Sequence, residues 1–148
     1  MTELVEVIEV DAFGNEIARS MKPLPQEVTL DFLKVSARAK LADLRWNKSQ
    51  TLTYDGVVAP ADGAMAALTG VVVAVQAGLI QPDATITWKL ADNEFRDWSA
   101  QDLLAYGAAV QAHIQECFVR EAAFCALIDA AADEEALDAI DFQEGWPS

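Results

Sequence analysis

The chain has 148 residues, of which 53% are hydrophobic and 23% are charged, and its formal net charge at pH 7 is −14. This length and composition are typical of one globular domain with a hydrophobic core, and they exclude a disordered chain. A chain this acidic lacks the density of Lys and Arg that phosphate groups require. We therefore expect neither nucleic acid nor an anionic membrane as a direct partner.

An N-terminal arm of strands and turns is predicted over residues 1–27. Residues 2–10 alternate apolar and acidic side chains, which predicts a strand. Residues 11–16 are typical of a turn, after which the chain returns as a short second strand. Pro23 and Pro25 then interrupt regular structure. The first residues have no basic segment followed by a long apolar one, so we expect no signal peptide and a cytoplasmic protein.

A helix is predicted from about Asp31 to Asn47. Apolar residues recur there at helical spacing in one stripe, formed by Phe32, Val35, Ala39, Ala42 and Trp46. A second apolar stripe beside it is formed by Leu33, Ala37, Leu41 and Leu44. The remaining face is basic and is expected to be exposed, with Lys34, Arg38, Arg45 and Lys48.

The segment from Ala64 to Gln81 has no charged side chain and approaches the lower length limit of a membrane-spanning helix. Small residues and Gln76 dilute its hydrophobicity, and no flanking Lys or Arg or aromatic belt accompanies it. We therefore expect a core helix, beginning near Pro60 and ending near Ala77, and no membrane span.

A β-hairpin is predicted over residues 86–98. With a two-residue turn at Asp92-Asn93, Leu90 faces Phe95 across the two strands. The inward face of this hairpin is then expected to supply core residues, namely Trp88, Leu90 and Phe95. A third strand near residues 51–54 would complete a small sheet.

A long helix is predicted to begin after Ser99, which is a suitable N-cap with the acidic Asp102 in the first turn. Spacings that alternate between four and three then describe a heptad seam, formed by Leu103, Gly107, Val110, Ile114, Cys117, Glu121, Phe124, Ile128 and Ala131. Such a helix is about 50 Å long, more than the width of a compact chain of this size. Either it folds entirely onto its own domain or its seam binds another molecule.

Together these elements predict an α+β fold. A small antiparallel sheet, with three main strands and an additional N-terminal hairpin, packs with three main helices, the last of them long and heptad-patterned. We expect an arm over residues 1–27, a main domain over 28–132 and an acidic C-terminal tail over 133–148. The last 28 residues contain eight acidic residues and no basic one, which is typical of a solvated segment.

Motifs of known chemistry are missing from the sequence. It contains no G-x-S-x-G, H-E-x-x-H, C-x-x-C, Walker or dinucleotide-binding motif. Its one histidine, His113, cannot by itself form a zinc site, which needs three or four ligands, so we expect it to be a structural or surface residue. Cys117 and Cys125 lie eight positions apart on one helix, too far for a disulfide. We therefore expect no catalytic residue, no cofactor and no metal.

The order of several motifs resembles a widespread phage and prophage domain of unknown function that is typically encoded near tail-fibre genes. The most specific elements are a W-x-x-A-D-N hairpin, formed by Trp88, Ala91, Asp92 and Asn93, and an A-H-[IV] step at Ala112-His113-Ile114. The resemblance covers about residues 30–132 and brings no catalytic residue with it. It implies an association with tail fibres, which is not in itself a mechanism.

These observations lead us to expect a non-enzymatic phage tail-region protein, first of all a tail-fibre assembly chaperone in the host cytoplasm. The alternative is a structural component of the virion at the tail tip or baseplate that anchors or decorates the fibre. A minor alternative, from charge alone, is an acidic inhibitor of a host nucleic-acid-binding enzyme. The expected partners are a tail fibre, another tail protein or a second copy of the chain. The hypothesised partner or oligomer interface consists of Val110, Ile114, Cys117, Phe124, Ile128, Phe142 and Trp146.

Overall fold

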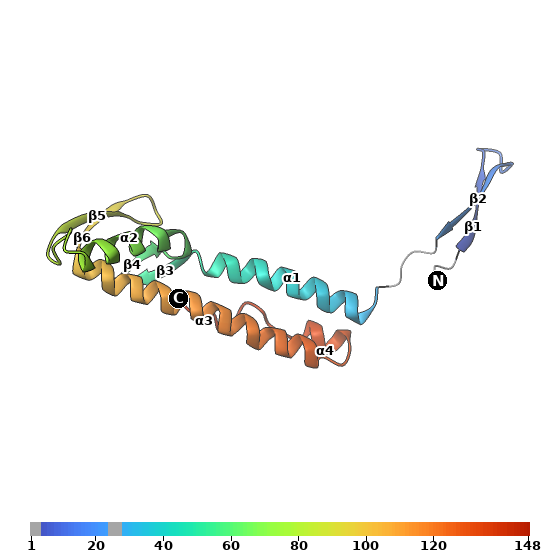
Figure 1. Cartoon of the computed structure of the whole chain (residues 1–148). Helices are drawn as coiled ribbons and strands as arrows, with labels where there is room; N and C mark the ends of the chain where they lie inside the picture. Colours follow the sequence, from blue (N-terminus) through green and yellow to red (C-terminus); the bar gives the residue numbers. More distant parts are fainter. Residues whose placement is uncertain (1–3, 24–27) are drawn as a thin grey trace. The chain divides into compact units, whose positions relative to one another are not determined.

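The structure is a computed structural model that describes residues 4–23 and 28–148 (Figure 1). The chain forms two compact units, Met1–Leu33 and Lys34–Ser148, with the boundary near the start of helix α1 (Leu30–Lys48). The described residues form four α-helices and three antiparallel sheets of two strands each. The predicted mixture of helices and antiparallel strands is thus confirmed.

The first unit contains a hairpin of strands β1 (Leu4–Val10) and β2 (Glu16–Pro23). The Asp11 carboxylate starts the turn by accepting hydrogen bonds from the backbone N–H of Asn15 and of Phe13, both 2.9 Å, and these bonds lower the Asp11 pKa. The N-terminal hairpin expected from the alternating pattern is therefore present. The predicted beginning of its first strand at residues 2–3 and the break at Pro25 lie outside the described residues.

In the second unit, strand β3 (Thr51–Tyr54) pairs with β4 (Val57–Pro60), so it does not extend the later hairpin as predicted. The reason is local, because Asp55 and Gly56 both have positive φ and close a two-residue turn between β3 and β4. Hairpin β5 (Thr85–Lys89) and β6 (Phe95–Ser99) forms a separate sheet. The Ala91 N–H donates to the Val58 carbonyl (3.2 Å) and connects the two hairpins.

The register of β5 and β6 differs by one residue from the prediction. The loop has three residues, Ala91 to Asn93, because Asn93 adopts a left-handed φ of 70° and the Leu90 N–H bonds to the Glu94 carbonyl. Lys89 therefore faces Phe95. A shift of one residue moves a strand's side chains to the opposite face, and Phe95 is accordingly 65% exposed and not a core residue.

The helices of the second unit begin and end close to the predicted positions. A short 3₁₀ turn (Asp62–Ala64) leads into α2 (Met65–Gln76), which packs on α3 (Ala100–Ala130). Ser99 and Asp102 form a reciprocal capping box at the start of α3, as the sequence predicted.

The described residues contain no helix with both the length and the hydrophobicity needed to cross a membrane.

The core of the second unit is built around Tyr106 on α3. Its ring lies 5.3 to 5.8 Å from three other aromatic rings, those of Tyr54, Trp88 and Trp98, which come from both hairpins. Its hydroxyl donates to the Pro60 carbonyl at the end of β4. Aliphatic side chains from α2 and α3 complete this cluster, including Leu68, Leu103 and Val110. One aromatic side chain of α3 thus holds both hairpins on the helix.

Six of the nine predicted seam residues are buried, but the buried face of α3 is displaced toward one side of the seam in the first half of the helix. Gly107 and Ile114 are only partly buried, and Tyr106 and His113 occupy the core-facing positions instead. From Leu103 the buried side chains follow a three-then-four spacing through Tyr106, Val110 and His113 to Cys117, and Phe124 and Ile128 continue the buried face. Counting three residues before four from Leu103 would have identified both Tyr106 and His113 as core-facing positions, and the burial of His113 agrees with the structural role expected as one of its two alternatives.

Candidate partner-binding surface

Most of the residues that sequence analysis assigned to an interface are covered by the chain itself. Four of them are almost completely buried, namely Val110, Cys117, Phe124 and Ile128. Ile114 is partly buried. Phe142 and Trp146 are partly buried and lie against the Phe124 ring, with centroids 5.3 and 5.8 Å away. The hypothesised interface is thus an internal packing surface, and a partner could reach it only by displacing part of the fold.

The C-terminal segment, residues 133–148, is folded onto α3 and is not a separate tail. It contains helix α4 (Glu134–Asp138), capped by the Asp133 side chain, and it buries Leu137. Arg120 on α3 donates two hydrogen bonds to the Glu144 carbonyl, at 2.9 and 3.2 Å. The acidic side chains of this segment remain exposed, as predicted, namely Asp133, Glu134, Glu135, Asp138, Asp141 and Glu144.

Helix α1 does not leave its whole basic face exposed as predicted. Three of its basic side chains contact α3, and among them Arg45 forms an ion pair with Glu121 (3.0 Å) that is only about 20% exposed. Arg38 pairs with Asp129, and the Lys34 ammonium donates to the Asp129 carbonyl (3.0 Å). Of the residues on α1, only Leu41 is fully buried. The inward face of α1 therefore combines the predicted stripe of Leu33, Ala37, Leu41 and Leu44 with Arg45, which pairs with an α3 acid.

A shallow groove lies along these ion pairs, and we call it the α1–α3 groove. Its floor is apolar and its rims are charged; it is lined by Arg38, Phe118, Glu121, Ala122, Cys125, Ala126 and Asp129. The Arg45 guanidinium lies 4.7 Å from the centre of the Phe118 ring, which holds this partly exposed aromatic in place. An apolar floor with charged rims is typical of a surface that binds protein.

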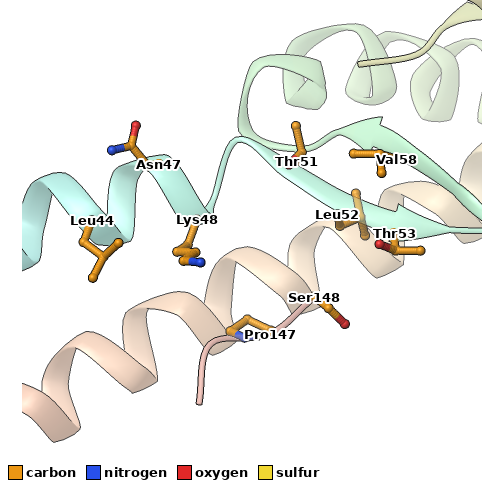
Figure 2. A pocket seen from close by; sticks show the side chains of 9 residues that line it. All are labelled: Leu44, Asn47, Lys48, Thr51, Leu52, Thr53, Val58, Pro147 and Ser148. Carbon is orange, nitrogen blue, oxygen red and sulfur yellow. The ribbon is translucent and has the colours of Figure 1, made fainter. Parts of the chain in front are cut away.

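A second hollow, of about 500 Å³, lies where the end of α1, the β3–β4 hairpin and the C-terminal segment meet (Figure 2). Figure 2 shows Lys48 on one side of it and Pro147 with Ser148 on another. Its charged lining residue is Lys48, and its polar ones include Thr51 and Thr53. The lining side chains can donate hydrogen bonds to a ligand, and none of them is a carboxylate, an imidazole or a thiol.

His113 and Cys117 are structural groups of the α1–α3 contact. The Nε2–H of the buried His113 donates to the Lys48 carbonyl at the end of α1 (2.8 Å). The Cys117 sulfur lies 3.8 Å from that nitrogen. Burial raises the pKa of the Cys117 thiol, so it stays protonated and is a poor nucleophile at neutral pH. Across residues 4–23 and 28–148, no group of three His, Cys, Asp or Glu side chains could hold a metal ion.

Comparison with known protein families gives a match over most of the chain. The family described as a domain of unknown function (DUF4376) matches residues 33–142, and therefore begins after the N-terminal hairpin. No curated protein and no solved structure matches the chain.

Proposed function

We propose that this chain, which belongs to the family described as a domain of unknown function (DUF4376), is a phage tail-fibre assembly chaperone without enzymatic activity. The link to tail fibres comes from the W-x-x-A-D-N and A-H-[IV] motifs at Trp88 and Ala112. A chaperone binds apolar surface on an unassembled partner and must itself stay soluble. The exposed side chains of the second unit bear on both requirements, the binding of apolar surface and solubility.

The observation that carries the proposal is a set of exposed apolar side chains on α1 and α3. They are Val35, Trp46, Phe118, Val119 and Leu127. Exposed aromatic and aliphatic groups on rigid helices can bury apolar surface of a client protein. The exposed acids of residues 133–148 keep such a protein soluble and would orient a client with a basic surface.

A non-enzymatic role is supported by how the chain uses its ionisable groups. Arg45, Glu121 and Arg38 are engaged in ion pairs between helices, and His113 and Tyr106 donate to backbone carbonyls. Each of these groups stabilises the fold. Acid–base catalysis instead needs such a group within reach of a substrate.

A structural component at the tail tip or baseplate remains the second candidate function. It is favoured by the two-unit organisation, since a separate N-terminal hairpin gives the chain a second element that could attach to the particle. The exposed carboxylates of residues 133–148 favour the acidic inhibitor less strongly, because the same segment also buries Leu137 and contributes Trp146 to packing.

The test is co-expression with the fibre polypeptide of the same phage genome, measuring the yield of soluble, trimeric fibre. Val119→Asp on α3 should lower that yield. Val73→Asp on α2 is a matched control, because Val119 and Val73 are both helical valines, 60% and 57% exposed. A fibre yield that is the same with and without this protein would refute the chaperone function. Mass spectrometry that finds the protein at fixed stoichiometry in purified virions would instead support the structural candidate.

A further inference from the structure

The N-terminal hairpin is a sheet of only two strands, and each strand has one unpaired edge among the described residues. An isolated two-stranded hairpin is marginally stable in water, and three or more strands are normally needed. This hairpin also exposes six large apolar side chains, those of Leu4, Ile8, Val10, Phe13, Ile17 and Met21. It belongs to its own compact unit and precedes the residues matched by the family. These properties indicate a module that is completed by another strand.

The two edges of the hairpin differ. Strand β2 ends with Pro23, which has no N–H to donate, and proline is a common way to prevent a sheet from growing at an edge. Strand β1 has the sequence LVEVIEV, with five β-favouring or apolar residues and neither proline nor lysine. The edge of β1 is therefore the one open to pairing.

We propose that β1 pairs antiparallel with β1 of a second copy of this chain, forming a four-stranded sheet in the order β2-β1-β1-β2. Pairing between identical edges is closed by a two-fold axis, so it stops at two copies. The strands that then lie outside are the β2 strands, each ending in proline. If β1 of one copy paired with β2 of the next, each new copy would leave another edge open and the sheet would grow without limit. Pro23 on β2 opposes that arrangement.

The charges of β1 are compatible with a register centred on Val7. If the two-fold axis passes through Val7, this residue faces Val7 of the second copy, and Glu6 faces Ile8. Glu9 then faces Val5, so no two carboxylates are directly opposite. Moving the axis to Glu6 would instead place the two Glu6 carboxylates directly opposite each other. Glu6 is moreover neutralised within its own hairpin by Arg19, 2.8 Å away, which reduces repulsion between the copies.

The experiment measures the mass of the full-length protein by light scattering over about a hundredfold range of concentration. We expect the mass to rise with concentration from 16.0 kDa toward twice that value. Val7→Lys and Val7→Glu each place two like charges opposite each other, so each should weaken dimerisation roughly fivefold. An equimolar mixture of the two variants should restore dimers, as heterodimers, because the charges are then opposite.

Ser20 supplies the matched control, since it faces Val7 within the same hairpin but lies on the outer strand of the proposed sheet. A mixture of Ser20→Lys and Ser20→Glu should show no preference for heterodimers. Recovery in the Val7 mixture cannot come from unfolding of the hairpin, so it distinguishes pairing from loss of structure. A monomer at every concentration, or no recovery in the Val7 mixture, would overturn the proposal. Heterodimer preference in the Ser20 mixture would also overturn it, by placing the interface on β2.

Discussion

The Tyr106 hydroxyl on α3 donates a hydrogen bond to the carbonyl oxygen of Pro60, the last residue of β4. The same ring contacts aromatic residues from both hairpins, so this one residue joins sheet and helix in the core. Its surroundings also affect its chemistry, because burial raises the pKa of Tyr106 to about 12. The phenol therefore remains a donor at every ordinary pH.

Tyr106→Phe should lower the free energy of unfolding by about 1 kcal/mol, the usual net contribution of one hydrogen bond. The pH dependence gives a second readout. Because the pKa is 10.0 in the unfolded chain and about 12 in the folded one, the contribution of Tyr106 is complete below pH 10 and is lost as the pH rises toward 12. Urea melts between about pH 9 and pH 12 should show a smaller decline in stability for Tyr106→Phe than for the parent protein. An identical decline in both proteins would contradict this environment for Tyr106.

Trp88→Ala should cost about 3–4 kcal/mol of stability, because the indole packs edge-on against Tyr106 in the core cluster. Phe95→Ala should cost less than about 1 kcal/mol, since Phe95 is 65% exposed on the other face of the hairpin. Chemical denaturation of the two variants measures the difference. Equal losses would mean that the two-residue turn, and not the observed three-residue loop, sets the register.

His113→Ala should lower stability by about 1–3 kcal/mol, because it leaves the Lys48 carbonyl without its donor and opens space beside Cys117. Gln115→Ala is the control, two positions along the same helix and exposed. Thermal melts should separate the two variants by several degrees. If both variants have the same melting temperature, the His113 imidazole does not hold the end of α1 to α3.

Gly145→Ala should lower stability by about 1–2 kcal/mol. Gly145 has a φ of 78°, which is unfavourable for a residue with a Cβ, and that Cβ would meet the Arg120 guanidinium. Arg120 would then lose its two hydrogen bonds to the Glu144 carbonyl. Gln143→Ala, at an exposed position, is the control. Limited proteolysis should cut the C-terminal segment faster in Gly145→Ala alone, and equal rates would refute its docking on α3.

Local patterns in the sequence determined the elements themselves. The capping residues Ser99 and Asp102, the alternation before Val10 and the helical spacing after Leu103 predict the start of α3, strand β1 and a long amphipathic helix. Each of these signals depends on interactions within a few residues, so the sequence contains all the necessary information. The spacing of Val110, Cys117 and Phe124 likewise predicts an apolar seam, but it leaves open whether the chain itself or another molecule covers that seam.

Tertiary structure alone decided which surfaces are covered. The inward side of α1 carries Leu41 from a predicted apolar stripe, but which of the two stripes turns inward, and the pairing of Arg45 and Arg38 with Glu121 and Asp129, involve residues more than 70 positions away. The hairpin register depends on the left-handed Asn93, which a two-residue turn and a three-residue loop could both accommodate. Phe142 and Trp146 carry no periodic signal of their own, and only the return of the chain along α3 brings them to Phe124. Long-range contacts of this kind are not encoded in any local pattern, which is why the assigned interface became part of the core.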